Sequence, residues 1–170
     1  MNNKKYVYFV EGPCEEKLID ALKKQPSLIC PGKIKVINVL QEVLSVSQLL
    51  QIQTGTVVSL VFDTDVSPTK ILQDNINALR RKCSRVEIVY LAQVRNLEEE
   101  LVRCTDVKRV TELTRSGSIQ NFKHDFCAAS DLRSTLKNHH LDMNLLWDTP
   151  RPEEYSCATR NSDVIKCKVI

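Results

Sequence analysis

Glycine is scarce in this chain: its 170 residues contain only four, and neither G-x-x-x-x-G-K nor G-x-G-x-x-G occurs. A P-loop and a dinucleotide-binding fingerprint are therefore excluded, because both need glycines that let the backbone approach a phosphate. No apolar run is long enough to span a bilayer, and the start, MNNKKYVYFVEG, lacks the apolar core and cleavage site of a secretory signal. We expect a cytoplasmic protein with no membrane association.

Paired cysteine motifs are also missing. The chain has seven cysteines, an odd number, and no C-x-x-C occurs among them. Their scatter predicts neither a zinc site nor a disulfide framework. We expect reduced thiols that pack as small apolar side chains.

The composition is that of an ordinary folded protein. Hydrophobic residues make up 42% of the chain, charged residues 26%, and the formal net charge is +3. That much apolar surface can build a core, so one domain with a short appendage is expected. The mild positive charge is compatible with a nucleic-acid partner without arguing for one.

Apolar runs of β type alternate with helical patterns in the first part of the chain, as in βαβ units with a parallel sheet. The run VVSLVF is apolar nearly throughout and predicts a central strand, whereas the second and fourth runs look more peripheral. The four expected strands cover residues 6–10, 34–40, 57–62 and 86–91.

Helices are expected between the strands and throughout the last part of the chain. Gly12 and Pro13 predict the start of one helix, and Ser67 and Pro68 predict the start of another. After Asn96, short apolar stripes at helical spacing replace the strand pattern. We predict an α/β domain over residues 1–105 and a helical or irregular extension over residues 106–170 that packs on it.

Acidic residues follow two of the expected strands. Glu11 ends the first strand, Glu15 lies in the first turn of the next helix, and Asp63 and Asp65 follow VVSLVF. Ligands of open α/β sheets bind outside the carboxyl ends of the strands. If the first and third strands are neighbours, as in a flavodoxin-like order, Glu11, Asp63 and Asp65 converge there.

Three carboxylates at one place repel one another unless a cation lies between them. Oxygen ligands without paired histidine or cysteine suit Mg²⁺ or Mn²⁺, which also bind phosphate oxygens. Such a metal can polarise a phosphodiester and activate a water molecule.

The run YVYFVEGPCEE (residues 6–16), followed by LVFDTD (residues 60–65), resembles the TOPRIM domain, which has a strand–Glu–Gly motif and a later D-x-D. TOPRIM domains occur in topoisomerases, bacterial primases, a ribosomal-RNA maturation nuclease and the OLD and RloB-like nucleases. The E-G-x-x-E form and the small size resemble the OLD and RloB nuclease branch most. The resemblance covers roughly residues 5–100 and implies a Rossmann-like fold.

The resemblance also implies roles for individual residues. Glu11 would be the metal-associated acid–base glutamate, Asp63 and Asp65 would be metal ligands, and Glu15 would match a second acidic position. A late acidic ligand of that branch would correspond to Glu98, which lies just after the fourth strand. The plainer alternatives are that Glu15 and Glu98 only complement a helix dipole, and that Asp65 only caps a loop.

Lys70 lies in the first turn of the helix that follows Asp63 and Asp65, where it could reach a phosphate beside the metal. A solvated surface lysine is the alternative. Lys123 is expected to be a surface lysine between two buried phenylalanines, and a late cation of the nuclease site is its other interpretation.

The sequence thus predicts a metal-dependent hydrolase that cleaves DNA or RNA, in phage defence or nucleic-acid processing. The alternative is a non-catalytic TOPRIM-like subunit that binds metal or nucleic acid and works with a partner chain such as an ATPase. A receiver-like phosphotransfer domain is a third option, but the fourth strand ends at Arg95 where that class needs a lysine. The oligomeric state stays open.

Overall fold

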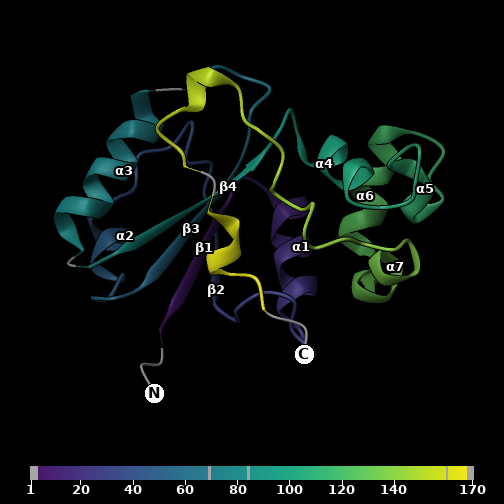
Figure 1. The fold of residues 1–170 in the computed structure, drawn as a ribbon, viewed down its shortest axis with the longest axis horizontal. Coiled ribbons are helices and arrows are strands. Elements are labelled where there is room, and N and C mark those ends of the chain that lie inside the picture. Colours follow the sequence, from purple (N-terminus) through teal and green to yellow (C-terminus); the bar gives the residue numbers. More distant parts are fainter. Residues whose placement is uncertain (1–3, 69, 84, 160, 168–170) are drawn as a thin grey trace.

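Four parallel strands form one sheet in the order β2-β1-β3-β4 (Figure 1). The computed structural model describes residues 4–68, 70–83, 85–159 and 161–167. The predicted α/β class with a parallel sheet is confirmed, and β1 lies beside β3 as in a Rossmann-like fold. The strands are β1 (Tyr6–Val10), β2 (Lys33–Val36), β3 (Val57–Asp63) and β4 (Glu87–Gln93).

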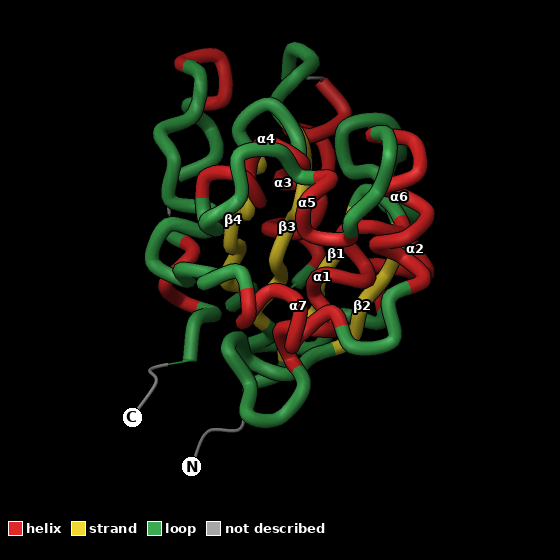
Figure 2. The backbone as a smooth tube through the Cα atoms, turned by 90° about the vertical axis from the view of Figure 1, so that its right-hand side faces the viewer, coloured by secondary structure: helices red, strands yellow, loops and turns green. Residues whose placement is uncertain are grey.

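Helices cover both faces of the sheet. Figure 1 shows α2 and α3 on one side, and α1 with α4 to α7 on the other. Figure 2, turned by 90°, shows the second group lying over the strands. The helices are α1 (Pro13–Lys23), α2 (Val46–Leu50), α3 (Lys70–Lys82), α4 (Leu97–Arg103), α5 (Thr111–Thr114), α6 (Ile119–Ala128) and α7 (Leu132–Asn138), followed by the 3₁₀ turns Glu153–Tyr155 and Ser162–Val164.

Local sequence explains where several of these helices begin. Pro13 occupies the first turn of α1, with Gly12 as an extended N-cap. The side chain of Ser45 accepts a hydrogen bond from the Gln48 N–H at the start of α2. The side chain of Asn96 accepts a hydrogen bond from the Glu99 N–H, which starts α4 directly after β4.

The second strand is shorter than predicted and ends at Val36 rather than at residue 40. Asn38 turns the chain there: its side chain accepts the Leu40 N–H at 3.0 Å, and its carbonyl accepts the Gln41 and Glu42 N–H groups. A side chain that bonds to nearby backbone competes in this way with a strand ladder.

The β4 strand lies at the edge of the sheet, as its pattern predicted, yet nearly all of it is buried. Asn161 covers the open edge. Its side chain accepts the Tyr90 N–H at 3.0 Å and donates to the Ile88 carbonyl at 2.9 Å. Backbone groups that would otherwise lack a partner are satisfied by a residue far along the chain.

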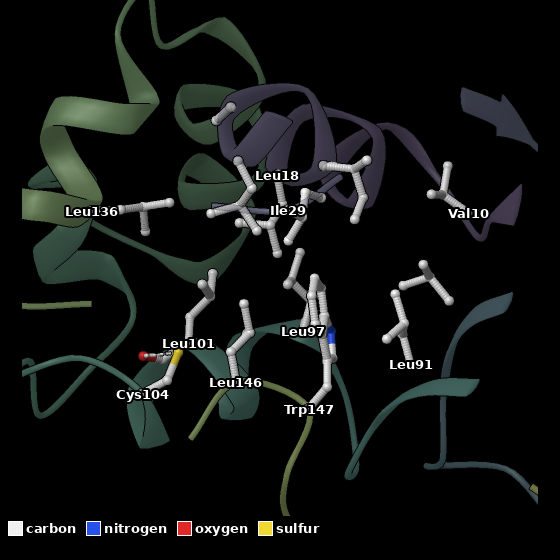
Figure 3. Packing of buried hydrophobic residues seen from close by; sticks show 14 of the residues in the cluster. Val10, Leu18, Ile29, Leu91, Leu97, Leu101, Cys104, Leu136, Leu146 and Trp147 are labelled. Carbon is white, nitrogen blue, oxygen red and sulfur yellow. Dashed lines mark hydrogen bonds between the residues drawn. The ribbon is translucent and has the colours of Figure 1, made fainter. Parts of the chain in front are cut away.

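Apolar side chains form one cluster on each face of the sheet. The cluster around α1 contains residues from both predicted parts of the chain. In Figure 3, Leu18 of α1 lies near Leu97 and Leu101 of α4, with Leu136 of α7 and Trp147 around them. The boundary between residues 1–105 and 106–170 stays a prediction, because this core is shared.

Helices of the described segments are all too short or too polar to cross a bilayer.

Candidate functional site

The first and third strands bring two predicted site residues together. Glu11 directly follows β1, and Asp63 is the last residue of β3. The Asp63 N–H donates a hydrogen bond to the Glu11 carboxylate, with 3.2 Å between N and Oε2. The two residues therefore meet at the carboxyl edge of the sheet, because parallel neighbouring strands end at the same side.

Glu15 and Glu98 approach the same place from the first turns of α1 and α4. Glu15 is only 8% exposed, and its pKa is raised by burial and by the charges of Glu11 and Glu98. A Cβ atom on Gly12 would lie 3.3 Å from Glu15 Oε2. Gly12 therefore gives the Glu15 carboxylate the room to fold back over the end of β1.

Asp63 is the centre of this acidic cluster (Glu11, Glu15, Asp63, Asp65 and Glu98). Its pKa is raised to about 8, first by burial and then by the charges of the other four carboxylates. Its Oδ1 atom is buried and has no hydrogen-bond partner among the residues that the structure describes. A carboxylate in such surroundings is neutralised by a proton or by a cation.

The acidic cluster suits a hard divalent cation in donor type and in charge. Carboxylate oxygens are the ligands that Mg²⁺ and Mn²⁺ prefer, and the unpartnered Asp63 oxygen is available to one. Among the described residues, however, no three histidine, cysteine, aspartate or glutamate side chains are close enough together to hold a metal. A cation would thus have to draw the carboxylates inward.

Asp65 and Lys70 lie further out than the other predicted residues. Asp65 is exposed in the loop after β3, although its charge still raises the pKa of Asp63. Lys70 is the first residue of α3 and is exposed. No hydrogen bond or ion pair joins it to the cluster within the described part of the chain.

Gln93 is a residue of this site that the sequence did not single out. It is the last residue of β4, pairs in register with Asp63 and is fully buried. Side chains alternate along a strand, so Gln93 shares a face with Val89 and Leu91, as Asp63 does with Val61. Within the described part of the chain, both polar atoms of the Gln93 amide lack a hydrogen-bond partner. The sequence signal for Gln93 was an amide residue at the end of an apolar strand that pairs with the strand ending in Asp63.

Lys123 also belongs to the surroundings of the site. It is an exposed residue of α6 between buried Phe122 and Phe126, as expected, but its ammonium lies 3.1 Å from Glu98 Oε1. The hydrogen bond and the charge of Glu98 raise the pKa of Lys123. The helical extension therefore contributes a cation at the rim of the acidic cluster.

Fold and site define an α/β protein with a parallel, Rossmann-like sheet and an acidic cluster at its carboxyl edge. Comparisons with protein-family models, curated proteins and solved structures gave no match to this chain. The TOPRIM resemblance therefore stays a prediction from the motifs.

Proposed function

We propose that this chain is a TOPRIM-type phosphodiesterase that cleaves DNA or RNA with Mg²⁺ or Mn²⁺. One observation carries the proposal: carboxylates from the ends of β1 and β3 and from the starts of α1 and α4 converge around a buried, unpartnered oxygen of Asp63. Several carboxylates at the carboxyl edge of a parallel sheet suit a metal site that faces a phosphate.

The acidic cluster would hold the cation, which when bound supplies charge neutralisation at the phosphate and an activated water molecule. Asp63 and Glu11 would be its inner ligands, because their backbones are fixed at the strand ends. Glu15, Asp65 and Glu98 would move inward from helix starts and a loop. Glu11 would also transfer a proton at the attacking or leaving oxygen.

Two lysines would contact the nucleic acid. Lys123 is held at the rim by Glu98, and a phosphate that arrives beside the cluster would compete for its ammonium. Lys70 at the start of α3 is exposed and free to reach a second phosphate. Their contribution would weaken as salt rises, since phosphate contacts release counterions.

The test is incubation of the purified chain with plasmid, single-stranded DNA and RNA, with and without Mn²⁺. Asp63→Asn keeps the shape of the side chain but removes a charge, so cleavage should fall by about 100-fold or more. Asp74→Asn is the matched control, because Asp74 is an exposed aspartate on α3 outside the cluster. Equal cleavage by wild type and Asp63→Asn would contradict the proposal.

The second candidate is a non-catalytic subunit that binds a metal or a nucleic-acid end. The observation that favours it is that no three acidic, histidine or cysteine side chains among the described residues form a ready ligand set, and catalysis needs the cation held in a fixed position more than simple binding does. In that case wild type would bind Mn²⁺, Asp63→Asn would not, and neither would cleave any substrate. Activity that appears only with an added ATPase partner would also assign this role.

A further inference from the structure

Two cysteines lie in contact where α1 meets the helical extension. The Sγ atoms of Cys14, in the first turn of α1, and Cys127, near the end of α6, are 3.3 Å apart although the residues are 113 positions apart in sequence. Both side chains are partly exposed, and their helices pack against each other. The Cys14 thiol also faces the Lys123 carbonyl on α6, at 3.8 Å. Both cysteines are free thiols in the structure.

We propose that Cys14 and Cys127 are a reversible oxidation site, which a low-molecular-weight disulfide such as oxidised glutathione converts into an intramolecular disulfide. The sulfur atoms have to approach by only about 1.3 Å to reach the bond length of a disulfide, about 2.05 Å. Once one of the two cysteines has formed a mixed disulfide with glutathione, the other is already in place to attack it, so the second exchange is far faster than a reaction between groups that must first meet.

The reaction is two successive thiol–disulfide exchanges. One cysteine, as its thiolate, attacks a sulfur of oxidised glutathione; the S–S bond breaks and one glutathione thiolate leaves. The second cysteine gives its proton to solvent and attacks the protein sulfur of this mixed disulfide, releasing the second glutathione thiolate. The two protein thiols lose two electrons, and the small disulfide gains them.

The disulfide would tie the two sides of the acidic cluster together. Cys14 follows the turn of Gly12 and precedes Glu15, whereas Cys127 shares α6 with Lys123, the partner of Glu98. A bond between the two helices fixes α6 relative to the end of β1. The proposal does not depend on the nuclease function, because it concerns the thiols alone.

The test uses the full chain, folded and reduced, then incubated with oxidised glutathione. Remaining thiols are blocked by alkylation and the disulfides are mapped by peptide mass spectrometry. We expect a peptide pair that joins Cys14 to Cys127, its reversal by dithiothreitol, and a higher melting temperature for the oxidised chain. Mapping is needed because the chain has five further cysteines, whose adducts or disulfides would change the mass in the same way.

Cys14→Ser should leave a single glutathione adduct on Cys127 and abolish the rise in melting temperature. Cys157→Ser is the matched control: Cys157 is exposed, and its loss should leave the Cys14–Cys127 bond intact. Recovery of Cys14 and Cys127 as separate thiols or separate adducts, after Cys157 has reacted completely, would overturn the proposal. A mapped disulfide without a change in melting temperature would overturn the coupling of the two helices. Both measurements, the disulfide mapping and the melting temperature, are made on the wild-type chain, so they remain valid even if a variant fails to fold.

Discussion

Asp63 is the residue at which burial and neighbouring negative charges most strongly oppose an ionised carboxylate. The charges of four other carboxylates oppose the ionisation of its side chain, and its covered oxygen has no donor among the described residues. The cation-free protein therefore holds a proton there near neutral pH. A cation can replace that proton, so metal binding should release it and strengthen as pH rises towards about 8.

The first prediction concerns stability in the presence of a chelator. The pKa of Asp63 is about 8 in the folded chain and about 3.9 in the unfolded chain. The contribution of its protonated form to the free energy of unfolding is therefore complete below pH 4 and is lost as pH rises to 8. The loss is at most about 1.4 kcal/mol for each pH unit in that window. Asp63→Asn mimics the protonated form and removes this slope.

Thermal unfolding from pH 4 to 9 measures the effect as a difference between wild type and variant. The melting temperature of Asp63→Asn should exceed that of wild type at pH 8 and match it at pH 4. Asp74→Asn, on exposed surface, should follow wild type throughout. Parallel curves for wild type and Asp63→Asn would show that Asp63 titrates normally.

Gln93 gives a second prediction. Its amide is fully buried without a partner, which costs stability of about 1–3 kcal/mol for each such group. Gln93→Leu should therefore keep or raise the melting temperature while it lowers Mn²⁺ affinity, since the amide faces Asp63 across the β3–β4 pair. Calorimetric Mn²⁺ titration measures the second effect. A more stable variant with unchanged Mn²⁺ affinity would remove Gln93 from the site.

At the scale of elements, helix α4 places two of its acidic residues, Glu98 and Glu100, in different surroundings. Glu98 belongs to the acidic cluster. Glu100 is fully buried, pairs with Arg103 at 2.6 Å and accepts a hydrogen bond from the backbone N–H of Trp147 at 2.6 Å. Arg103 in turn donates to the Val94 carbonyl at 2.7 Å. These hydrogen bonds connect α4 to Val94, just after β4, and to Trp147 in the helical extension.

Glu100→Ala should destabilise the fold by about 1–3 kcal/mol, because it leaves the buried backbone N–H of Trp147 without an acceptor, while Arg103 is partly exposed and keeps the Val94 carbonyl. Glu99→Ala, on the exposed side of the same turn, should change stability by less than about 0.5 kcal/mol. Urea unfolding of both variants gives the comparison. Similar unfolding midpoints for the two would mean that the buried network contributes little.

Local patterns were enough to predict β1 and the start of α1, because both depend on residues within one βα unit. The meeting of Glu11 with Asp63 needed one further assumption, that the first and third strands are neighbours, which the strand order confirms. The end of β2 was missed, since it depends on hydrogen bonds of the Asn38 side chain. Gln93 was missed because its place beside Asp63 depends on the register between β3 and β4. The contact of Lys123 with Glu98 was not predicted because it depends on the packing of α6 on α1.

At the scale of the whole molecule, the chain after residue 105 reaches both faces of the sheet. Trp147 lies in the cluster around α1, and Tyr155 stacks on Phe62 in the cluster on the other face, with 5.6 Å between ring centroids. The Tyr155 hydroxyl donates to the Val66 carbonyl at 2.6 Å, in the loop after β3. Figure 1 shows this yellow segment crossing the upper end of the sheet. The extension therefore holds the loop that contains Asp65 in place through this hydrogen bond.

The last prediction is that residues 1–105 do not fold stably alone. Removal of residues 106–170 would uncover Leu18, Leu101 and Phe62, which are buried in the full chain, and each fully exposed side chain of this kind costs about 1.5–3 kcal/mol. For three such side chains the sum is about 4.5–9 kcal/mol, which is comparable with the whole stability of an ordinary small domain, about 5–15 kcal/mol. We expect the fragment to aggregate or to unfold without a cooperative transition, as measured by circular dichroism during heating.

Co-expression with residues 106–170 should restore solubility if packing is the cause. A soluble 1–105 fragment with a sharp thermal transition would show that the extension is a separate unit, and its Mn²⁺ binding would then show whether the acidic cluster needs that extension.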